Sequence, residues 1–99
     1  MSHPLYDITA FEVVTGYVLR VRFNDGTEQL VDFEPVLFGE MYAPLRDVTV
    51  FNQVRLDDET RTLVWSNGAD FDPWVLHEWP RVVEQLSRRL QAAAIAASG

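Results

Sequence analysis

Hydrophobic and polar residues alternate through residues 17–33, and this period of two predicts an antiparallel hairpin. The apolar positions continue on both sides of an Asn-Asp-Gly turn: Leu19, Val21, Phe23, Val31 and Phe33. A three-residue loop at residues 24–26, with Gly26 left-handed, keeps these positions on one face, whereas a two-residue loop mixes the faces. The pattern therefore predicts the longer loop, with Leu19 opposite Val31 and Arg22 opposite Glu28.

Two further segments have the pattern of strands. Residues 9–15 alternate and end at Gly16, which predicts a first strand. Residues 54–65 predict a second hairpin, in which a four-residue loop at residues 58–61 pairs Leu56 with Leu63 and Val54 with Trp65. The segment between the hairpins contains two prolines and a glycine and is expected to be irregular, with Asp47 capping one helical turn over residues 48–51.

Helical signals gather near the end of the chain. Asp72-Pro73 combines an N-cap residue with a proline at the first helical position, and Pro80 can open a longer helix of about residues 80–97. In that helix, apolar residues three and four apart form one stripe: Val83, Leu86, Leu90, Ala93 and Ala97.

These elements predict an α+β fold in a single domain, residues 1–99. We expect a curved antiparallel sheet of four to five strands, formed by hairpins 17–33 and 54–66. The C-terminal helix is expected to pack on this sheet, with one or two short helices elsewhere. A chain of this length buries roughly 65% of its unfolded surface, which is enough for one core.

The charge and the absence of cysteine exclude several classes of function. The chain has 15 acidic residues against eight arginines, and it has no lysine and no cysteine. Thiolate catalysis and Cys-type zinc sites are therefore excluded, and the net charge of −7 disfavours nucleic-acid binding. No signal peptide, membrane helix or phosphate-binding glycine loop is visible, so we expect a cytoplasmic protein without a cofactor.

One cluster in the sequence has the composition of a site: Asp70, Asp72, His77 and Glu78. Two carboxylates and an imidazole near a helix start can bind a divalent cation or transfer protons. The structural interpretation is that Asp72 caps the helix, that Asp70 accepts from backbone amides at the Asn67-Gly68 corner, and that His77 and Glu78 point in different directions.

A second set of residues fits a protein interface: Trp74, Trp79, Val83, Leu86 and Leu90. Aromatic residues concentrate at binding hot spots, and the helical stripe can zip to a second copy as a dimer. The alternative is that the same side chains fill the core of this chain, because two heptads are short for a coiled coil.

Four motifs carry a resemblance to a known family. They are Phe-Asn-Asp-Gly at 23–26, Pro-Leu-Arg-Asp at 44–47, Phe-Asn-Gln-Val at 51–54 and Trp-Ser-Asn-Gly-Ala-Asp-Phe-Asp-Pro at 65–73. Over about residues 7–78 the chain resembles the bacterial and phage family known as domain-of-unknown-function family 2442. Two residues depart from its pattern: Ser66 stands where many members have proline, and Trp74 is bulkier than usual. The helix of about residues 80–97 lies outside the shared region.

The resemblance implies a small α+β domain with a curved antiparallel sheet and no established activity. It also implies a protein partner, because members resemble the antitoxin-like half of gene pairs with a second small family, numbered 4160. The hypothesis is therefore a non-catalytic interaction module that binds itself or a small neighbouring gene product. Two alternatives stay open: an enzyme using the Asp70, Asp72, His77 and Glu78 cluster, and a DNA-associated regulator, which the acidic charge disfavours.

Overall fold

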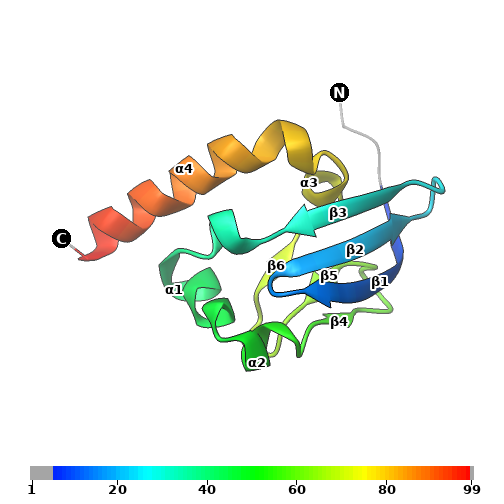
Figure 1. The fold of residues 1–99 in the computed structure, drawn as a ribbon, viewed down its shortest axis with the longest axis horizontal. Coiled ribbons are helices and arrows are strands. Elements are labelled where there is room, and N and C mark those ends of the chain that lie inside the picture. The colour runs from blue at the N-terminus through cyan, green and yellow to red at the C-terminus, as the bar shows by residue number, and fades with distance from the viewer. Residues whose placement is uncertain (1–5, 99) are drawn as a thin grey trace.

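The computed structural model describes residues 6–98 and shows an α+β fold with two antiparallel sheets (Figure 1). The first sheet has three strands in chain order: β1 (Ile8–Thr15), β2 (Val18–Phe23) and β3 (Glu28–Asp32). The second has three shorter strands: β4 (Arg55–Leu56), β5 (Leu63–Val64) and β6 (Asp70–Phe71). The predicted class is confirmed, but the single sheet of four to five strands is wrong.

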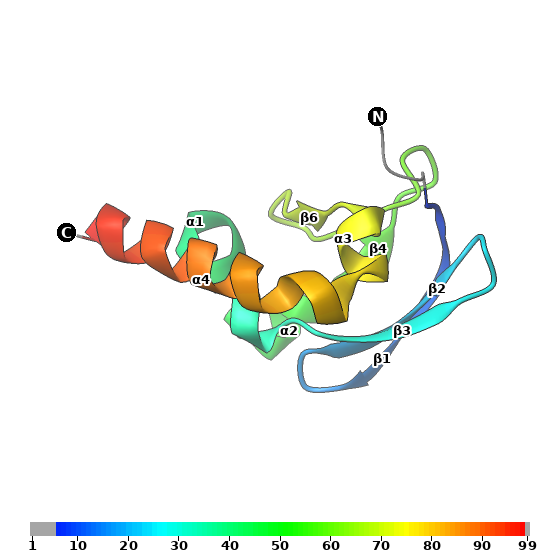
Figure 2. The ribbon, with the colours of Figure 1, turned by 90° about the horizontal axis from the view of Figure 1, so that it is seen from above.

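The two sheets stay separate because little backbone connects them. Ile8 N donates to Arg61 O at 3.0 Å, but β4, β5 and β6 span only two residues each and cannot extend a common ladder. The first sheet is curved, and its concave side faces α3 and β4 (Figure 2). Side-chain packing between the sheets must therefore replace the backbone pairing that a single sheet would have.

The first hairpin has the register that the alternation predicts. Leu19 pairs with Val31 and Arg22 pairs with Glu28. Gly26 has φ of +86°, a left-handed conformation that glycine adopts without strain, so the three-residue loop is confirmed. Val31 and Leu19 are fully buried, which explains why the register is specified: a slip of one residue would expose this face.

Four short helices connect the sheets, where one helical turn was expected. They are η1 (Glu34–Val36), α1 (Gly39–Tyr42), η2 (Ala43–Arg46) and α2 (Val48–Phe51). Pro35 and Pro44 stand in the first turns of η1 and η2, where proline is tolerated, so they begin helices rather than interrupt them. The predicted cap is confirmed, because Asp47 Oδ1 accepts from Thr49 N at 2.9 Å.

The second hairpin also pairs as predicted, with Leu56 opposite Leu63. The ladder ends one pair earlier than expected, because Trp65 N donates to Ala69 O rather than pairing with Val54. This bond closes the corner that leads from β5 into β6.

Two helices complete the chain: α3 (Pro73–His77) and α4 (Trp79–Ser98). Asp72 caps α3 as predicted, accepting from Trp74 N at 2.8 Å. The long helix was expected to cover the sheet, but α4 packs chiefly on η1, α1 and α3 (Figures 1 and 2). Ser87 donates its hydroxyl hydrogen bond to Pro35 O and so ties α4 to η1.

The core centres on the ring of Phe33, the first residue after β3. Its centroid lies 5.7 Å from that of Phe51, 5.5 Å from Trp65, 5.1 Å from Phe71 and 5.5 Å from Trp79. These neighbours come from α2, the second sheet and the start of α4. One aromatic side chain therefore joins the end of the first sheet to α2, the second sheet and α4.

No helix among residues 6–98 is both long enough and apolar enough to cross a membrane.

We expect Phe33→Ala to destabilise the fold by about 3–5 kcal/mol, because it leaves a cavity between four aromatic rings. Leu30→Ala on the outer face of β3, where Leu30 is 57% exposed, should change stability by less than about 0.5 kcal/mol. Urea unfolding followed by tryptophan fluorescence measures both. Equal losses for the two variants would contradict the central role of Phe33.

We expect a chain truncated before Arg81 to lose cooperative thermal unfolding, because Val83, Leu86 and Leu90 pack against the core. A chain ending after Leu90 keeps these contacts and should retain the transition. Near-ultraviolet circular dichroism during heating distinguishes them. If the chain truncated before Arg81 unfolded in a sharp transition at the Tm of the full-length chain, α4 would be dispensable for folding.

Candidate functional site

The structure divides the four residues of the predicted cluster among three places: β6, the start of α3 and the end of α3. Asp72 caps α3, and Asp70 is an exposed residue of β6. Asp70 does not accept from the corner amides as expected: Asn67 Oδ1 accepts from Ala69 N at 3.1 Å instead. Among residues 6–98, no three His, Cys, Asp or Glu side chains are placed to share a metal ion.

Asp70 contributes to the environment of Tyr42 rather than to that of His77. Tyr42 donates its hydroxyl hydrogen bond to the backbone oxygen of Asp70 at 2.9 Å. Burial of the Tyr42 ring raises the pKa of its hydroxyl, and the charge of Asp70 raises it further. Tyr42 therefore remains protonated and acts as a hydrogen-bond donor to β6.

His77 and Glu78 contact each other, and Asp25 and Thr27 from the β2–β3 turn join them. We call these four residues the His77 cluster. His77 Nδ1 lies 2.7 Å from Glu78 Oε2, and Nε2 lies 2.9 Å from Asp25 Oδ2. Thr27 donates to Asp25 Oδ1 at 2.6 Å and lies 3.1 Å from His77 Nε2. The cluster thus ties the tip of the first hairpin to the end of α3.

The expectation that His77 and Glu78 point apart is wrong because Glu78 lies outside the helix. It is the C-cap of α3, with φ of −98° and ψ of 22°, so the spacing of helical side chains does not apply to it. Asp25 was not identified from the sequence as a site residue, because Asp25-Gly26 is a typical turn sequence and the hairpin turn already explains the aspartate. No local signal relates Asp25 to a histidine 52 residues away.

Aromatic rings enclose the histidine on two sides. The Tyr6 ring stacks on His77 with centroids 3.8 Å apart and an angle of 7°, and the edge of Phe23 approaches at 4.9 Å. Only 16% of the His77 side chain is exposed. The imidazole is therefore held in one orientation, between a carboxylate on each ring nitrogen.

The two carboxylates favour the charged imidazole. Burial alone lowers the pKa of His77, but the hydrogen bonds to Glu78 and Asp25 and the attraction of both charges outweigh it, so the pKa lies above 6.5. Hydrogen bonds from Thr27 lower the pKa of Asp25 to about 2. The hydrogen bond from His77, followed by that from Arg81, lowers the pKa of Glu78. A protonated His77 that donates from both nitrogens satisfies all of these contacts.

This geometry fits a structural ion pair better than a catalytic or metal site. Asp25 and Glu78 lie on opposite nitrogens of the ring, so they cannot converge on one cation with His77. A general base needs a nitrogen free to take a proton, and neither nitrogen of His77 is free while the cluster is intact.

The residues predicted for an interface lie in different environments. Trp79 is only 5% exposed and belongs to the core, and Val83, Leu86 and Leu90 are half-buried against it. Trp74 is half-buried beside α4. The side chain of Ala97, the last of the predicted stripe, lies outside the described side chains.

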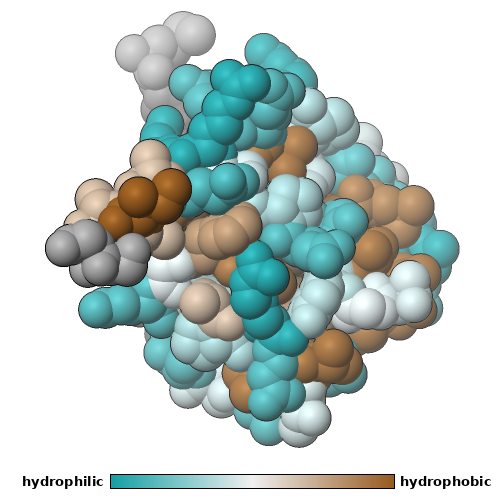
Figure 3. Space-filling view, turned by 60° about the vertical axis from the view of Figure 1, so that its left-hand side comes forward, coloured by the Kyte–Doolittle hydropathy of each residue, from teal (hydrophilic) through white to brown (hydrophobic). Residues whose placement is uncertain are grey.

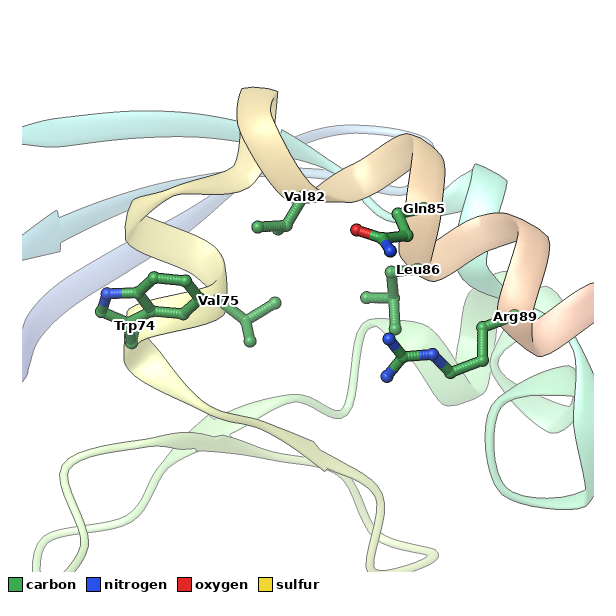
Figure 4. Close-up of a pocket in the computed structure, with 6 residues that line it drawn as sticks. All are labelled: Trp74, Val75, Val82, Gln85, Leu86 and Arg89. Carbon is green, nitrogen blue, oxygen red and sulfur yellow. The ribbon is translucent and has the colours of Figure 1, made fainter. Parts of the chain in front are cut away.

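A groove of about 270 Å³ lies between α3 and α4 (Figure 4). We call it the α3–α4 groove, and six residues line it: Trp74, Val75, Val82, Gln85, Leu86 and Arg89. The sequence pattern contained a partial signal for it, because Val82 is apolar but lies off the core-facing stripe of its helix.

A second apolar surface lies at the end of α4, where hydrophobic side chains gather beside the chain terminus (Figure 3). Phe38, Gln91, Ala94 and Ile95 surround a hollow of about 360 Å³, and Ile95 is 71% exposed. None of these lining residues is charged. The surface can bury apolar area, and among its four described lining residues Gln91 alone has a polar side chain to orient a ligand.

The family described as Protein of unknown function (DUF2442) matches residues 8–81. The chain belongs to this family. The resemblance seen in the motifs is thus confirmed over both sheets and α3. No curated protein and no solved structure matches the chain.

DUF2442 membership specifies a domain and not an activity, so the functional argument depends on the two sites. The His77 cluster lies wholly within the matched residues. The α3–α4 groove lies across the end of the match, because Trp74 and Val75 fall inside it and Val82, Leu86 and Arg89 follow it.

The His77 cluster should make stability depend on pH. Because folding raises the pKa of His77, the charged imidazole stabilises the fold fully below pH 6.5. This stabilisation is lost as the pH rises through the pKa that His77 has in the folded protein. Because folding lowers the pKa values of Glu78 and Asp25, their charged carboxylates stabilise the fold above pH 4.5 and pH 3.8, respectively. This stabilisation is lost as the pH falls through the pKa values of the folded protein. We expect the Tm difference between wild type and His77→Gln to be largest near pH 5.5.

Differential scanning calorimetry from about pH 2 to 9 measures this difference. The control is Glu84→Gln, which removes the exposed pair with Arg88 and no histidine contact, and its Tm difference should stay nearly constant from pH 5 to 9. A His77→Gln difference that is equally independent of pH would show that the imidazole is not charged in the cluster.

Proposed function

We propose that this DUF2442 protein is a non-catalytic protein-interaction module, the acidic and antitoxin-like member of a pair formed with a small neighbouring gene product. The observation that carries the proposal is the α3–α4 groove, in which Trp74, Val75, Val82 and Leu86 keep apolar surface at the exterior. Exposed apolar surface with a polar rim is typical of protein-binding sites.

The distribution of titratable groups supports binding over catalysis. His77 is the histidine among residues 6–98, and both of its ring nitrogens face carboxylates. Asp70 and Asp72, which an enzyme using the predicted cluster would need, lie in β6 and at the cap of α3. The metal-dependent alternative therefore has less support than the interaction module.

The charge supports a protein partner rather than nucleic acid. The net charge of −7 repels phosphate backbones and attracts a basic protein at long range. A partner of basic net charge is consistent with an acidic antitoxin-like member.

Titration calorimetry of the purified chain with the neighbouring gene product tests the proposal. We expect a defined complex, and a partner at about 100 times its Kd should raise the Tm by about 10 °C or more. The neighbouring product expressed alone should also arrest growth, and co-expression of this chain should relieve the arrest.

Light scattering of the chain alone serves as the control for self-association. The proposal of a two-protein pair fails if the neighbouring product gives no heat at 100 μM and leaves the Tm unchanged. A stable dimer of this chain that excludes the product would place the interaction between two copies instead.

A further inference from the structure

The α3–α4 groove lies along a face of α4 next to the face that packs on the core. Val83 and Leu90 pack on the core, and Ser87 binds Pro35 O on the same side of the helix. Val82, Leu86 and Arg89 follow each other at spacings of four and three, which places them on an adjacent face, and Leu86 also packs against the core. Figure 4 shows these side chains opposite Trp74 and Val75 of α3.

The groove combines apolar walls with one cation at its edge. Trp74, Val75, Val82 and Leu86 form the walls, and the Arg89 side chain folds back toward Leu86 (Figure 4). In the described part of the chain, Arg81 pairs with Glu78 and Arg88 pairs with Glu84, but Arg89 makes no ion pair. Its guanidinium therefore retains donors for a carboxylate from outside.

The charge of α4 is opposite to that of the rest of the molecule. The helix carries three arginines against one glutamate, whereas the remainder carries five arginines against 14 acidic residues. A carboxylate approaching the groove therefore meets the basic part of an acidic protein.

The volume limits what the groove can hold. At about 270 Å³ it lies below the range of about 300–1,000 Å³ that is typical of small-molecule pockets. It has room for one or two apolar side chains of a peptide, whose backbone remains at the surface.

We propose that the α3–α4 groove binds a short peptide segment in which a leucine-type side chain adjoins a carboxylate, with the carboxylate on Arg89. The proposal rests on the proposed function and names the class of segment that the partner contributes. Arginine binds carboxylates through two parallel hydrogen bonds, so Arg89 selects the acidic residue while the apolar walls take its neighbour.

The test uses N-acetyl-L-leucine as the probe and N-acetyl-L-leucinamide as its uncharged match. Each is titrated to about 50 mM at constant ionic strength into the isotope-labelled full chain, and binding is followed by NMR. We expect shifts at the Trp74 indole, the Val82 and Leu86 methyls and Arg89 Nε. The carboxylate should bind about two- to fivefold more tightly than the amide, as an exposed ion pair allows.

Arg89→Gln should reduce this preference to about one without affecting folding, because the side chain is exposed. The matched control is Arg88→Gln, which removes the neighbouring arginine already paired with Glu84 and should preserve the preference. Equal binding of the two probes to the wild type would overturn the role of Arg89. No shifts in the groove at the highest concentration would overturn the site itself.

The same variants separate this inference from the proposed function. If the neighbouring gene product binds wild type and Arg89→Gln equally, the interaction module stands and the groove assignment fails. If the probes bind as expected and the product does not bind, the groove chemistry stands and the pairing fails. If the wild-type chain is a dimer and the Arg89→Gln variant is a monomer, a second copy of this chain occupies the groove. The proposal that the partner contributes the bound segment would then be overturned.

Discussion

The packing around Phe33 is the constraint on which the rest of this fold depends. Within residues 6–98, the backbone link between the sheets is the hydrogen bond from Ile8 N of β1 to Arg61 O in the β4–β5 loop, so the sheet ladders cannot hold them together. Aromatic side chains do so instead, because the Phe33 ring contacts residues from α2, the second sheet and α4. Trp65 adds a fixed polar contact within this core by donating from Nε1 to Phe51 O at 2.8 Å. The architecture is therefore held by side-chain packing between small layers.

The position of the groove follows from the same packing. Trp79 enters the aromatic core at the first residue of α4, which fixes where the helix begins. The hydrogen bond from Ser87 to Pro35 O then fixes its rotation over η1. With the beginning and rotation set, the face that carries Val82 and Arg89 must lie beside α3. The groove is thus a geometric consequence of how the core positions α4.

The sequence predicted the local features of this fold and missed the long-range ones. Residue parity was sufficient for the register of Leu19 with Val31, and Asp72 beside Pro73 was sufficient for the start of α3. Strand patterns carry no information on whether two hairpins share a sheet, so the split into two sheets was not predicted. For the site, the sequence named His77 and Glu78 but not Asp25. Their contact requires the hairpin to fold back over 52 residues and Glu78 to leave helical geometry.

The charges of the molecule act at two ranges, and together they restrict the chemistry of the proposed partner. Beyond the Debye length of about 8 Å at physiological salt, a partner senses chiefly the net charge of −7, which favours a basic protein. At contact it meets α4, where arginines outnumber acidic residues and Arg89 lies at the edge of the groove. A uniformly basic surface would be attracted from a distance and repelled at Arg89. For the proposed partner, the charges therefore favour a protein that is basic overall but presents one carboxylate beside an apolar side chain, and this single acidic residue within a basic surface would give the contact its specificity.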